Sequence, residues 1–287
     1  MSDIAIALLD AANYALILIL VALGLAIIFG LMNVINLAHG EFLMVGAYVL
    51  LTVKMSGGSL WLGFIAAPLA VGCLGLIIEE LIIRRIYHRV IDTILATWGL
   101  SLLIKQLIVL GFGPGSHSVE TPISAVVMIF GTPYPVYRLF IMAVSLICVA
   151  STFYFFFRTR TGLAARGVIA NRQMSACLGV NTRKLDRLTF AIGAGLAGFA
   201  GAVIAPLISI DPQMGLGFLV PGFLAILIGG LGTIVGPVAG ATGVGFADNL
   251  TATFLSPVWA QFVVFVLSII VIRMAPGGLL GRMRRNV

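Results

Sequence analysis

The chain has 287 residues, of which 61% are hydrophobic and only 9% are charged, and its formal net charge is +7. A soluble domain usually carries about 25% charged residues and about 45–50% apolar residues. One soluble fold cannot hide this much apolar surface from water, so the composition excludes a soluble enzyme and favours a protein embedded in lipid.

The first ten residues, MSDIAIALLD, contain Asp3 and Asp10 and no Lys or Arg. A cleaved secretory signal peptide begins with a basic region, which is missing here. We therefore expect the first apolar run to stay in the protein as a membrane helix.

Apolar segments of membrane-spanning length follow one another along the chain. A helix needs about 20 apolar residues to cross the hydrocarbon core. By that length we expect membrane segments near residues 11–31, 36–55, 60–83, 91–112, 137–158, 188–209, 218–236 and 238–275, the last divided by Asp248-Asn249 and Ser256-Pro257. The prediction is an all-α integral membrane protein, a polytopic bundle of about eight transmembrane helices, or nine if a weak segment is re-entrant.

Basic residues lie mainly on one side of these segments. The positive-inside rule then assigns to the cytoplasm residues 32–35, 84–90 and 159–187, the turn near Gly236-Pro237, and the tail after residue 275. Fourteen of the seventeen Lys and Arg residues lie in or beside these stretches, and only Lys54, Lys105 and Arg138 do not. We expect the N-terminus outside and the C-terminus inside. Basic residues clustered in short loops do not form a nucleic-acid-binding face.

Two longer segments lie outside the expected membrane core. Residues 113–136 are rich in Gly and Pro and predict an outer loop, with one short interfacial helix. Residues 159–187 predict two short cytoplasmic helices, about 163–170 and 172–178, with Asn171 as the N-cap of the second and Gly179 as its stop. The second helix would present a small apolar face of Met174, Cys177 and Leu178. An alternative is a basic loop bound to anionic lipid headgroups.

Small residues recur every four positions in the later helices. One ridge is Gly193, Ala197 and Gly201, and a neighbouring ridge is Ala194, Gly198 and Ala202; a third is Ala239, Gly243 and Ala247. Such ridges let helix backbones approach closely in lipid. We expect a single transmembrane domain over residues 1–287.

Three separated motifs stand out: GLMNVINLAHGEFLMVGAY at 30–48, the segment from Gly162 through Leu178-Gly179-Val180-Asn181, and MAPGGLLGR at 274–282. In this order and spacing they resemble the permeases of ATP-binding-cassette importers for branched-chain amino acids and urea, and the resemblance implies a single transmembrane permease domain. In this family a short cytoplasmic helix seats in a groove of the ATPase. The resemblance implies that the coupling residues here are Gly162, Arg166, Asn171, Met174, Leu178, Gly179 and Asn181.

The resemblance also implies partners. It implies a second homologous permease, somewhat longer, in a heterodimer, together with two cytoplasmic ATPase subunits, an extracytoplasmic solute-binding protein, and a location in a bacterial-type plasma membrane. The sequence has no G-x-x-x-x-G-K-[ST] phosphate loop, so ATP and Mg²⁺ would bind to partner chains and no cofactor is expected in this one. His39, His88 and His117 lie far apart, and no metal site is expected.

The segment Asn36-Leu-Ala-His39-Gly40-Glu41 places an imidazole and a carboxylate near the inner end of the second span. Ionisable groups at membrane depth are costly and usually face a cavity or a partner. Two interpretations stay open. Asn36, His39 and Glu41 could line a pathway or gate, or they could tie the start of the helix to its neighbours by hydrogen bonds.

Other polar residues at depth are weaker pathway candidates. Thr97 and Ser101 share one helix face, and Trp98 between them is either an anchor or filler or a solute contact. Asp248 and Asn249 would lie toward the outer half of a late span.

The sequence leaves the solute and one rival function open. The segment from Asp92 to Ser101 resembles the corresponding helix of urea and short-amide permeases and favours urea or an amide over a branched-chain amino acid. The rival is a self-sufficient channel or ion-coupled secondary transporter, for which Glu41 or Asp248 would supply the ion site. An intramembrane enzyme is disfavoured because no paired catalytic carboxylates, Ser/His couple or metal ligands are apparent.

Overall fold

The computed structural model describes residues 2–87, 89–129 and 131–279. The elements in chain order are α1 (Ser2–Met32), α2 (His39–Met55), α3 (Leu60–Leu81), the 3-10 turn η1 (Ile83–Arg85), α4 (Val90–Phe112), β1 (Val126–Ile129), β2 (Thr132–Pro135), α5 (Val136–Arg158), α6 (Arg160–Ala170), α7 (Arg172–Cys177), α8 (Thr182–Ile204), the 3-10 turn η2 (Ala205–Leu207), α9 (Leu216–Gly229), α10 (Gly236–Phe254) and α11 (Pro257–Met274).

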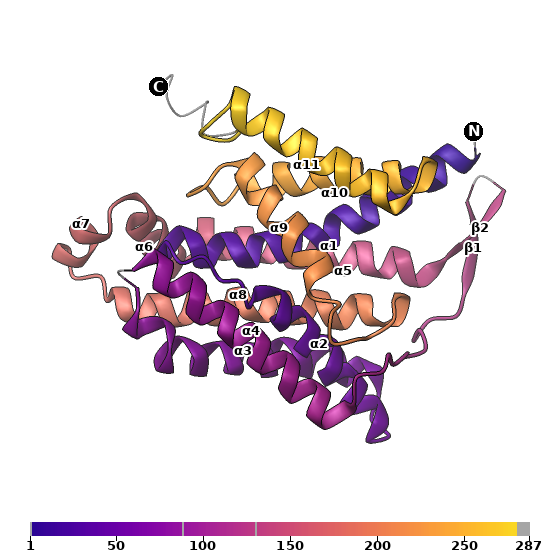
Figure 1. Ribbon diagram of the computed structural model, residues 1–287, viewed down its shortest axis with the longest axis horizontal. Helices are drawn as coiled ribbons and strands as arrows, with labels where there is room; N and C mark the ends of the chain where they lie inside the picture. The colour runs from indigo at the N-terminus through magenta and orange to yellow at the C-terminus, as the bar shows by residue number, and fades with distance from the viewer. Residues whose placement is uncertain (1, 88, 130, 280–287) are drawn as a thin grey trace.

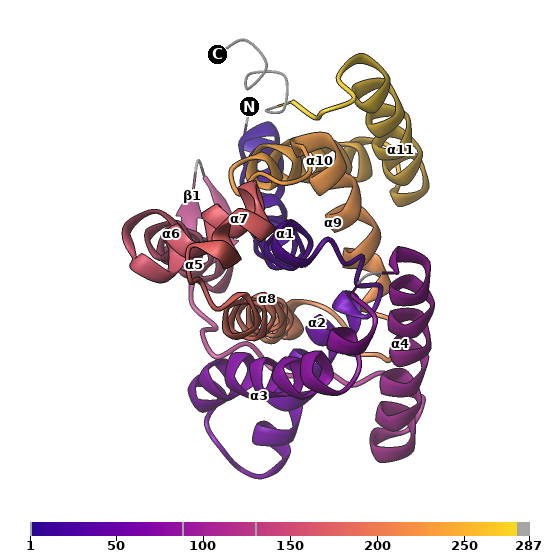
Figure 2. The same cartoon turned by 90° about the vertical axis from the view of Figure 1, so that its left-hand side faces the viewer.

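Helices α1 and α8 form the centre of the bundle, and the other helices surround them (Figure 2). The two helices meet where each carries a glycine. A Cβ added to Gly24 would lie 2.6 Å from the carbonyl oxygen of Gly193, and one added to Gly193 would lie 2.6 Å from that of Gly24. No side chain fits at either position, so the backbones touch directly.

The helices α1–α4 and α8–α11 form two halves that repeat the same packing in opposite directions. Helix α3 packs against α8, and α10 packs against α1 in the same way; α2 and α9 likewise each pack against the first helix of the other half. In Figure 1, α1 runs from the end near the N-terminus toward the end that carries α7, and α8 runs back. An inverted repeat of this kind is a common architecture of membrane transporters.

The second helix of each half begins inside the bundle, after a non-helical stretch at 33–38 or 208–215. The two helix starts touch. A Cβ added to Gly40 in α2 would lie 2.6 Å from the Gly215 carbonyl oxygen, and one added to Gly215 would lie 2.4 Å from that of Gly40.

Fewer described helices than the eight expected have the length and hydropathy of a complete membrane crossing. Among the described residues, six helices are long and apolar enough to cross a membrane, and α9 is a shorter apolar helix. Helix α2 has only 17 residues because it starts at His39, and α10 is less apolar because it contains Asp248 and Asn249. The predicted eight crossings also cannot place the termini on opposite sides, which requires an odd number.

Two other expectations need correction. The described residues of the outer loop, 113–129 and 131–136, contain no separate short helix; they include the antiparallel strands β1 and β2, in which Val126 pairs with Pro135, and Gly131 between the strands has φ 81°. Pro133 and Pro135 cannot continue a helix. The ridges on α8 are buried as expected, but on α10 Ala239 and Gly243 are exposed, and Gly240 packs against the Ala225 carbonyl instead.

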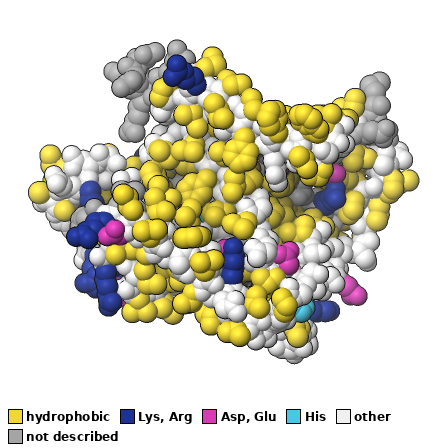
Figure 3. Space-filling model, in the orientation of Figure 1, with side chains coloured by type: hydrophobic (Ala, Val, Ile, Leu, Met, Phe, Trp, Pro, Cys, Tyr) yellow, Lys and Arg dark blue, Asp and Glu magenta, His cyan; other side chains and the backbone are white. Residues whose placement is uncertain are grey.

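Charged and hydrophobic side chains separate on the surface. Figure 3 shows hydrophobic side chains over the broad middle of the molecule and the largest group of Lys and Arg at the end that carries α7. This separation matches a lipid-facing belt with a basic end, as the positive-inside rule expects.

Candidate functional site

Local hydrogen bonds shape the segment from 159 to 187 as expected. The Asn171 side chain accepts a hydrogen bond from the Met174 backbone N–H at 2.9 Å and so caps α7. Gly179 ends this turn at φ 85°, a conformation that favours glycine, and the Asn181 side chain accepts from the Lys184 N–H at 3.0 Å to start α8. Gly162 lies where a Cβ would be 2.2 Å from the Phe155 carbonyl oxygen.

The tip of this segment, Leu163, Met174 and Leu178, presents apolar side chains to the outside. Their exposed fractions are 63%, 59% and 77%. The tip lies at the basic end of the molecule, away from the broad hydrophobic belt (Figures 1 and 3). Large exposed apolar residues among charged ones are typical of a surface that binds another protein.

Arg172, which the sequence analysis did not single out, anchors α7 to the bundle. Its guanidinium forms two hydrogen bonds to Asp186 in α8, one at 3.0 Å, and a third at 3.1 Å to the Leu31 carbonyl near the end of α1. The Asp186 side chain is only 1% exposed. The guanidinium also lies 5.9 Å from the centre of the Tyr87 ring. One side chain thus connects α7 with both central helices.

Tyr87 extends this cluster toward α3. Its hydroxyl donates a hydrogen bond to Glu79 near the end of that helix. Burial and this hydrogen bond raise the pKa of the Tyr87 phenol well above its ordinary value, so the phenol keeps the proton that it donates. Beside it, Glu80 pairs with Arg183 at 2.9 Å and with Arg187 at 3.4 Å. The base of α8 is therefore fastened to α3 as well as to α7.

A second cluster lies at the start of α2. Glu41 is fully buried and accepts a hydrogen bond from the Ser101 hydroxyl at 2.8 Å, and the Lys105 ammonium lies 3.2 Å from the same carboxylate oxygen. Lys105 was missed as a site residue. Two features of the sequence pointed to it. Lys105 is one of the three basic residues outside the expected cytoplasmic segments, and it follows Thr97 and Ser101 at intervals of four residues, on the same face of the helix.

The other residues of this cluster make structural contacts. The Thr97 hydroxyl accepts from the Leu37 N–H at 3.1 Å, and the Asn36 side chain accepts from the Ala38 N–H at 3.1 Å. His39 is fully buried, and its Nε2 lies 3.2 Å from the Val21 carbonyl in α1. Trp98 is 56% exposed on the outside of α4. These contacts favour the interpretation that this segment ties α2 to its neighbours rather than lining an open path.

Asp248 and Asn249 lie apart from that cluster, and although they are neighbours in α10 they line different pockets. Asp248 lines a pocket between α9, α10 and α11, together with Gln261. Asn249 lines a different one, beside Asp10, Asn13 and Arg138. The pathway candidates therefore occupy three separate places. No group of three or more potential metal ligands occurs among the described residues, which do not include His88.

Comparison with known proteins decides the family. The family described as "Branched-chain amino acid transport system / permease component" matches residues 7–272. The chain belongs to this family. It is a multi-pass membrane permease component of an ABC transport system and not itself an enzyme, and no cofactor is expected in it.

Curated members of the family align over nearly the whole chain. The permease protein LivH of the high-affinity branched-chain amino acid transport system from Salmonella typhimurium is 28% identical over 279 residues, covering 92% of this chain and 91% of its own. The corresponding permease BraD of Pseudomonas aeruginosa is 28% identical over 282 residues, with the same coverage. A probable branched-chain amino acid permease, LivH of Methanocaldococcus jannaschii, is 25% identical over 287 residues, covering 93% and 90%. No solved structure matches.

These relatives bear on two earlier expectations. All are named for branched-chain amino acid transport, so the preference for urea or a short amide, drawn from residues 92–101, has no support. The third motif of the resemblance, at 274–282, extends beyond the described residues, which end at 279.

Proposed function

We propose that the chain is the membrane permease of an importer for branched-chain amino acids. In this proposal ATP is hydrolysed by two separate cytoplasmic subunits, a solute-binding protein delivers the amino acid from outside, and a second homologous permease completes the pathway. The named relatives support the solute class.

One observation carries the coupling role: an exposed apolar tip at the basic end of the molecule is fastened to the central helices through Arg172. We place this end in the cytoplasm, with the N-terminus outside and the C-terminus inside. A groove of the ATPase would bury Met174 and Leu178, which are otherwise exposed. Movement of the ATPase would then pass through the Arg172–Asp186 pair to α8 and, through the Leu31 carbonyl, to α1.

The second permease has two exposed faces available to it. In Figure 2, α4 and α11 lie on the same side of the bundle. Large apolar side chains on both helices are exposed, including Leu107 and Leu110 on α4 and Phe262 and Ile269 on α11. We propose that lipid and the partner permease share this side.

The rival channel or secondary transporter is less consistent with the geometry. An ion site needs a carboxylate that is free to bind the ion, and Glu41 is already paired with Lys105 and Ser101. Asp248 has no cationic partner among the described residues, but it accepts a hydrogen bond from the Tyr14 hydroxyl of α1. Flux of solute through the purified chain alone, without ATP, would support the rival.

The experiment that tests the proposal is Leu178→Asp in the assembled complex. A carboxylate at this position would place a charge in an apolar groove, so we expect transport and the stimulation of ATPase activity by loaded binding protein to fall at least tenfold, while the bundle itself remains folded.

The matched control is Met128→Asp on β1, an apolar position of similar exposure (69%, against 77% for Leu178) near the opposite end of the molecule. We expect it to leave the stimulation of ATPase activity unchanged. Normal stimulation in the Leu178→Asp complex would contradict the coupling role of this segment.

A further inference from the structure

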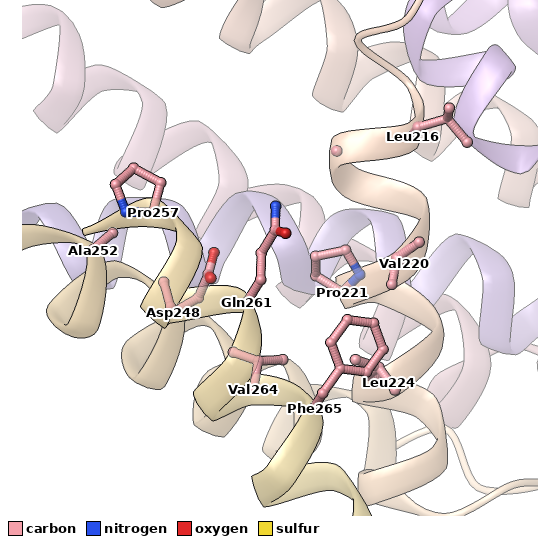
Figure 4. Close-up of a pocket in the computed structure, with 12 residues that line it drawn as sticks. Leu216, Val220, Pro221, Leu224, Asp248, Ala252, Pro257, Gln261, Val264 and Phe265 are labelled. Carbon is pink, nitrogen blue, oxygen red and sulfur yellow. The ribbon is translucent and has the colours of Figure 1, made fainter. Parts of the chain in front are cut away.

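A pocket of about 390 Å³ opens between α9, α10 and α11. Its size is within the range of small-molecule sites, about 300–1,000 Å³. Figure 4 shows the side chains of Asp248 from α10 and Gln261 from α11 extending toward the space that α9 borders on the other side. The pocket therefore combines a few polar groups from two helices with an opposing apolar helix.

A third polar group comes from the backbone of α9. Pro221 lies within this helix and has no N–H, so the carbonyl of Gly217, four residues earlier, lacks its usual helical donor. Gly217 lines the pocket, and a Cβ added to it would meet nothing within 4 Å. Gly217 therefore brings a backbone carbonyl without its usual helical donor to the edge of this pocket.

The remaining wall is apolar. Val220 and Leu224 from α9 and Val264 and Phe265 from α11 line it. A hydrated metal ion gains nothing from such a wall, whereas an aliphatic side chain is stabilised by it.

We propose that this pocket binds the α-ammonium group of an aliphatic amino acid in transit, with the solute's side chain against the apolar wall. Asp248 and the Gly217 carbonyl accept hydrogen bonds from the ammonium, and the Gln261 amide is placed to bind either the ammonium or the solute carboxylate. The proposal rests on the proposed function, because it assumes that an amino acid passes through this chain.

The ligand chemistry matches both parts of the pocket. An ammonium next to a carboxylate is a charge-assisted contact, which is stronger than a neutral hydrogen bond. All three acceptors come from residues in helices, Gly217 in α9, Asp248 in α10 and Gln261 in α11, so helix packing rather than a flexible loop sets their positions.

A cysteine-protection experiment tests this site directly. Cys73, Cys148 and Cys177 are replaced by Ser, Ala252→Cys is introduced in the pocket, and its rate of reaction with a small thiol reagent is measured on the complete purified transporter without ATP or binding protein. We expect L-leucine to slow the reaction at least threefold. 4-Methylpentanoate, which is leucine without its ammonium, should give no protection.

Variants separate the ammonium contact from general packing. Asp248→Asn should abolish protection by leucine, whereas Asp211→Asn, a carboxylate in the outer segment before α9, should leave it unchanged. Equal protection by leucine and 4-methylpentanoate, or no protection by leucine, would overturn the proposal.

The outcome is independent of the coupling test. If leucine does not protect Ala252→Cys but ATPase activity is still stimulated normally by loaded binding protein, only the proposed ammonium site is contradicted. If leucine does protect Ala252→Cys and the Leu178→Asp complex shows normal ATPase stimulation, the coupling role is contradicted and the ammonium site is supported.

Discussion

The two halves of the bundle use the same helix arrangement for different chemistry. In the first half, the fourth helix, α4, is joined to the start of α2 by the buried Glu41–Lys105 pair and by Ser101. In the second half, the fourth helix, α11, faces α9 across a pocket that contains Asp248 and Gln261. The first junction is closed and neutralised, whereas the carboxylate of the second accepts a hydrogen bond from the Tyr14 hydroxyl of α1 and still lines a pocket.

The same helix arrangement can therefore contain one junction that is held in place by an ion pair and another that can contact a solute. A buried carboxylate paired with an ammonium and a hydroxyl holds its helix in place, and breaking the pair leaves an uncompensated charge. A carboxylate that lines a pocket can accept a charged group from a passing solute. We infer that the polar residues of the first half stabilise the bundle, whereas those of the second half contact the solute.

The largest expected effect comes from the contact that both halves share. Gly40→Val and Gly215→Val each add a branched side chain where even a Cβ would lie 2.6 or 2.4 Å from a backbone carbonyl oxygen. Because backbone must move to admit it, we expect little or no folded protein in the membrane, measured by size-exclusion chromatography after extraction. Gly99→Val, at a glycine of α4 with open space around it, is the control and should express normally. Normal expression of the Gly40 variant would show that the two helix starts do not need close contact.

Lys105→Met probes the closed junction of the first half. The substitution leaves Glu41 buried without its cation, which typically destabilises a protein by about 3–5 kcal/mol. We expect a clear fall in melting temperature in detergent. The double variant Glu41→Gln with Lys105→Met removes both charges and should recover most of the loss. An unchanged melting temperature in the single variant would mean that the ion pair does not hold α4.

Gln261→Lys would make the second half resemble the first. An ammonium beside Asp248 should neutralise it and occupy the pocket, so we expect unchanged or slightly higher thermal stability with transport reduced several-fold. Gln261→Met, of similar size and without charge, should reduce transport less. Full transport by the lysine variant would contradict the functional contrast between the halves.

Local features of the structure could be predicted from the sequence. Asn171 and Gly179 delimit α7 as expected, because a cap and a left-handed glycine act within a few residues. The buried ridges of α8 were also visible, because a spacing of four residues defines one face of a helix.

The breaks inside the membrane could not be predicted. Hydropathy predicted one helix over 36–55 and another over 218–236, but α2 starts at His39 and α9 covers only Leu216–Gly229. Leu37 is as apolar as the residues of a helix, so its composition does not reveal that the chain is non-helical up to residue 38.

Ion pairs between residues far apart in the chain could not be predicted from the sequence either. Arg172 meets Asp186, and Glu41 meets Lys105, only because different helices bring them together. Glu41 was identified as a costly charge at depth, but its partner required the fold. Asp248 was selected for the same reason, whereas Gly217 and Pro221 became informative only when α9 was placed beside α11.

The crossing of α1 and α8 at Gly24 and Gly193 has a mechanical consequence. With no side chains between them, the two helices can rock about this point as about a fulcrum. At about 1.5 Å per residue, Gly24 lies about 12 Å from Met32 at one end of α1 and about 21 Å from Asp10 toward the other. A lever with such unequal arms would turn a small push near Arg172 into nearly twice the displacement at the opposite mouth of the bundle.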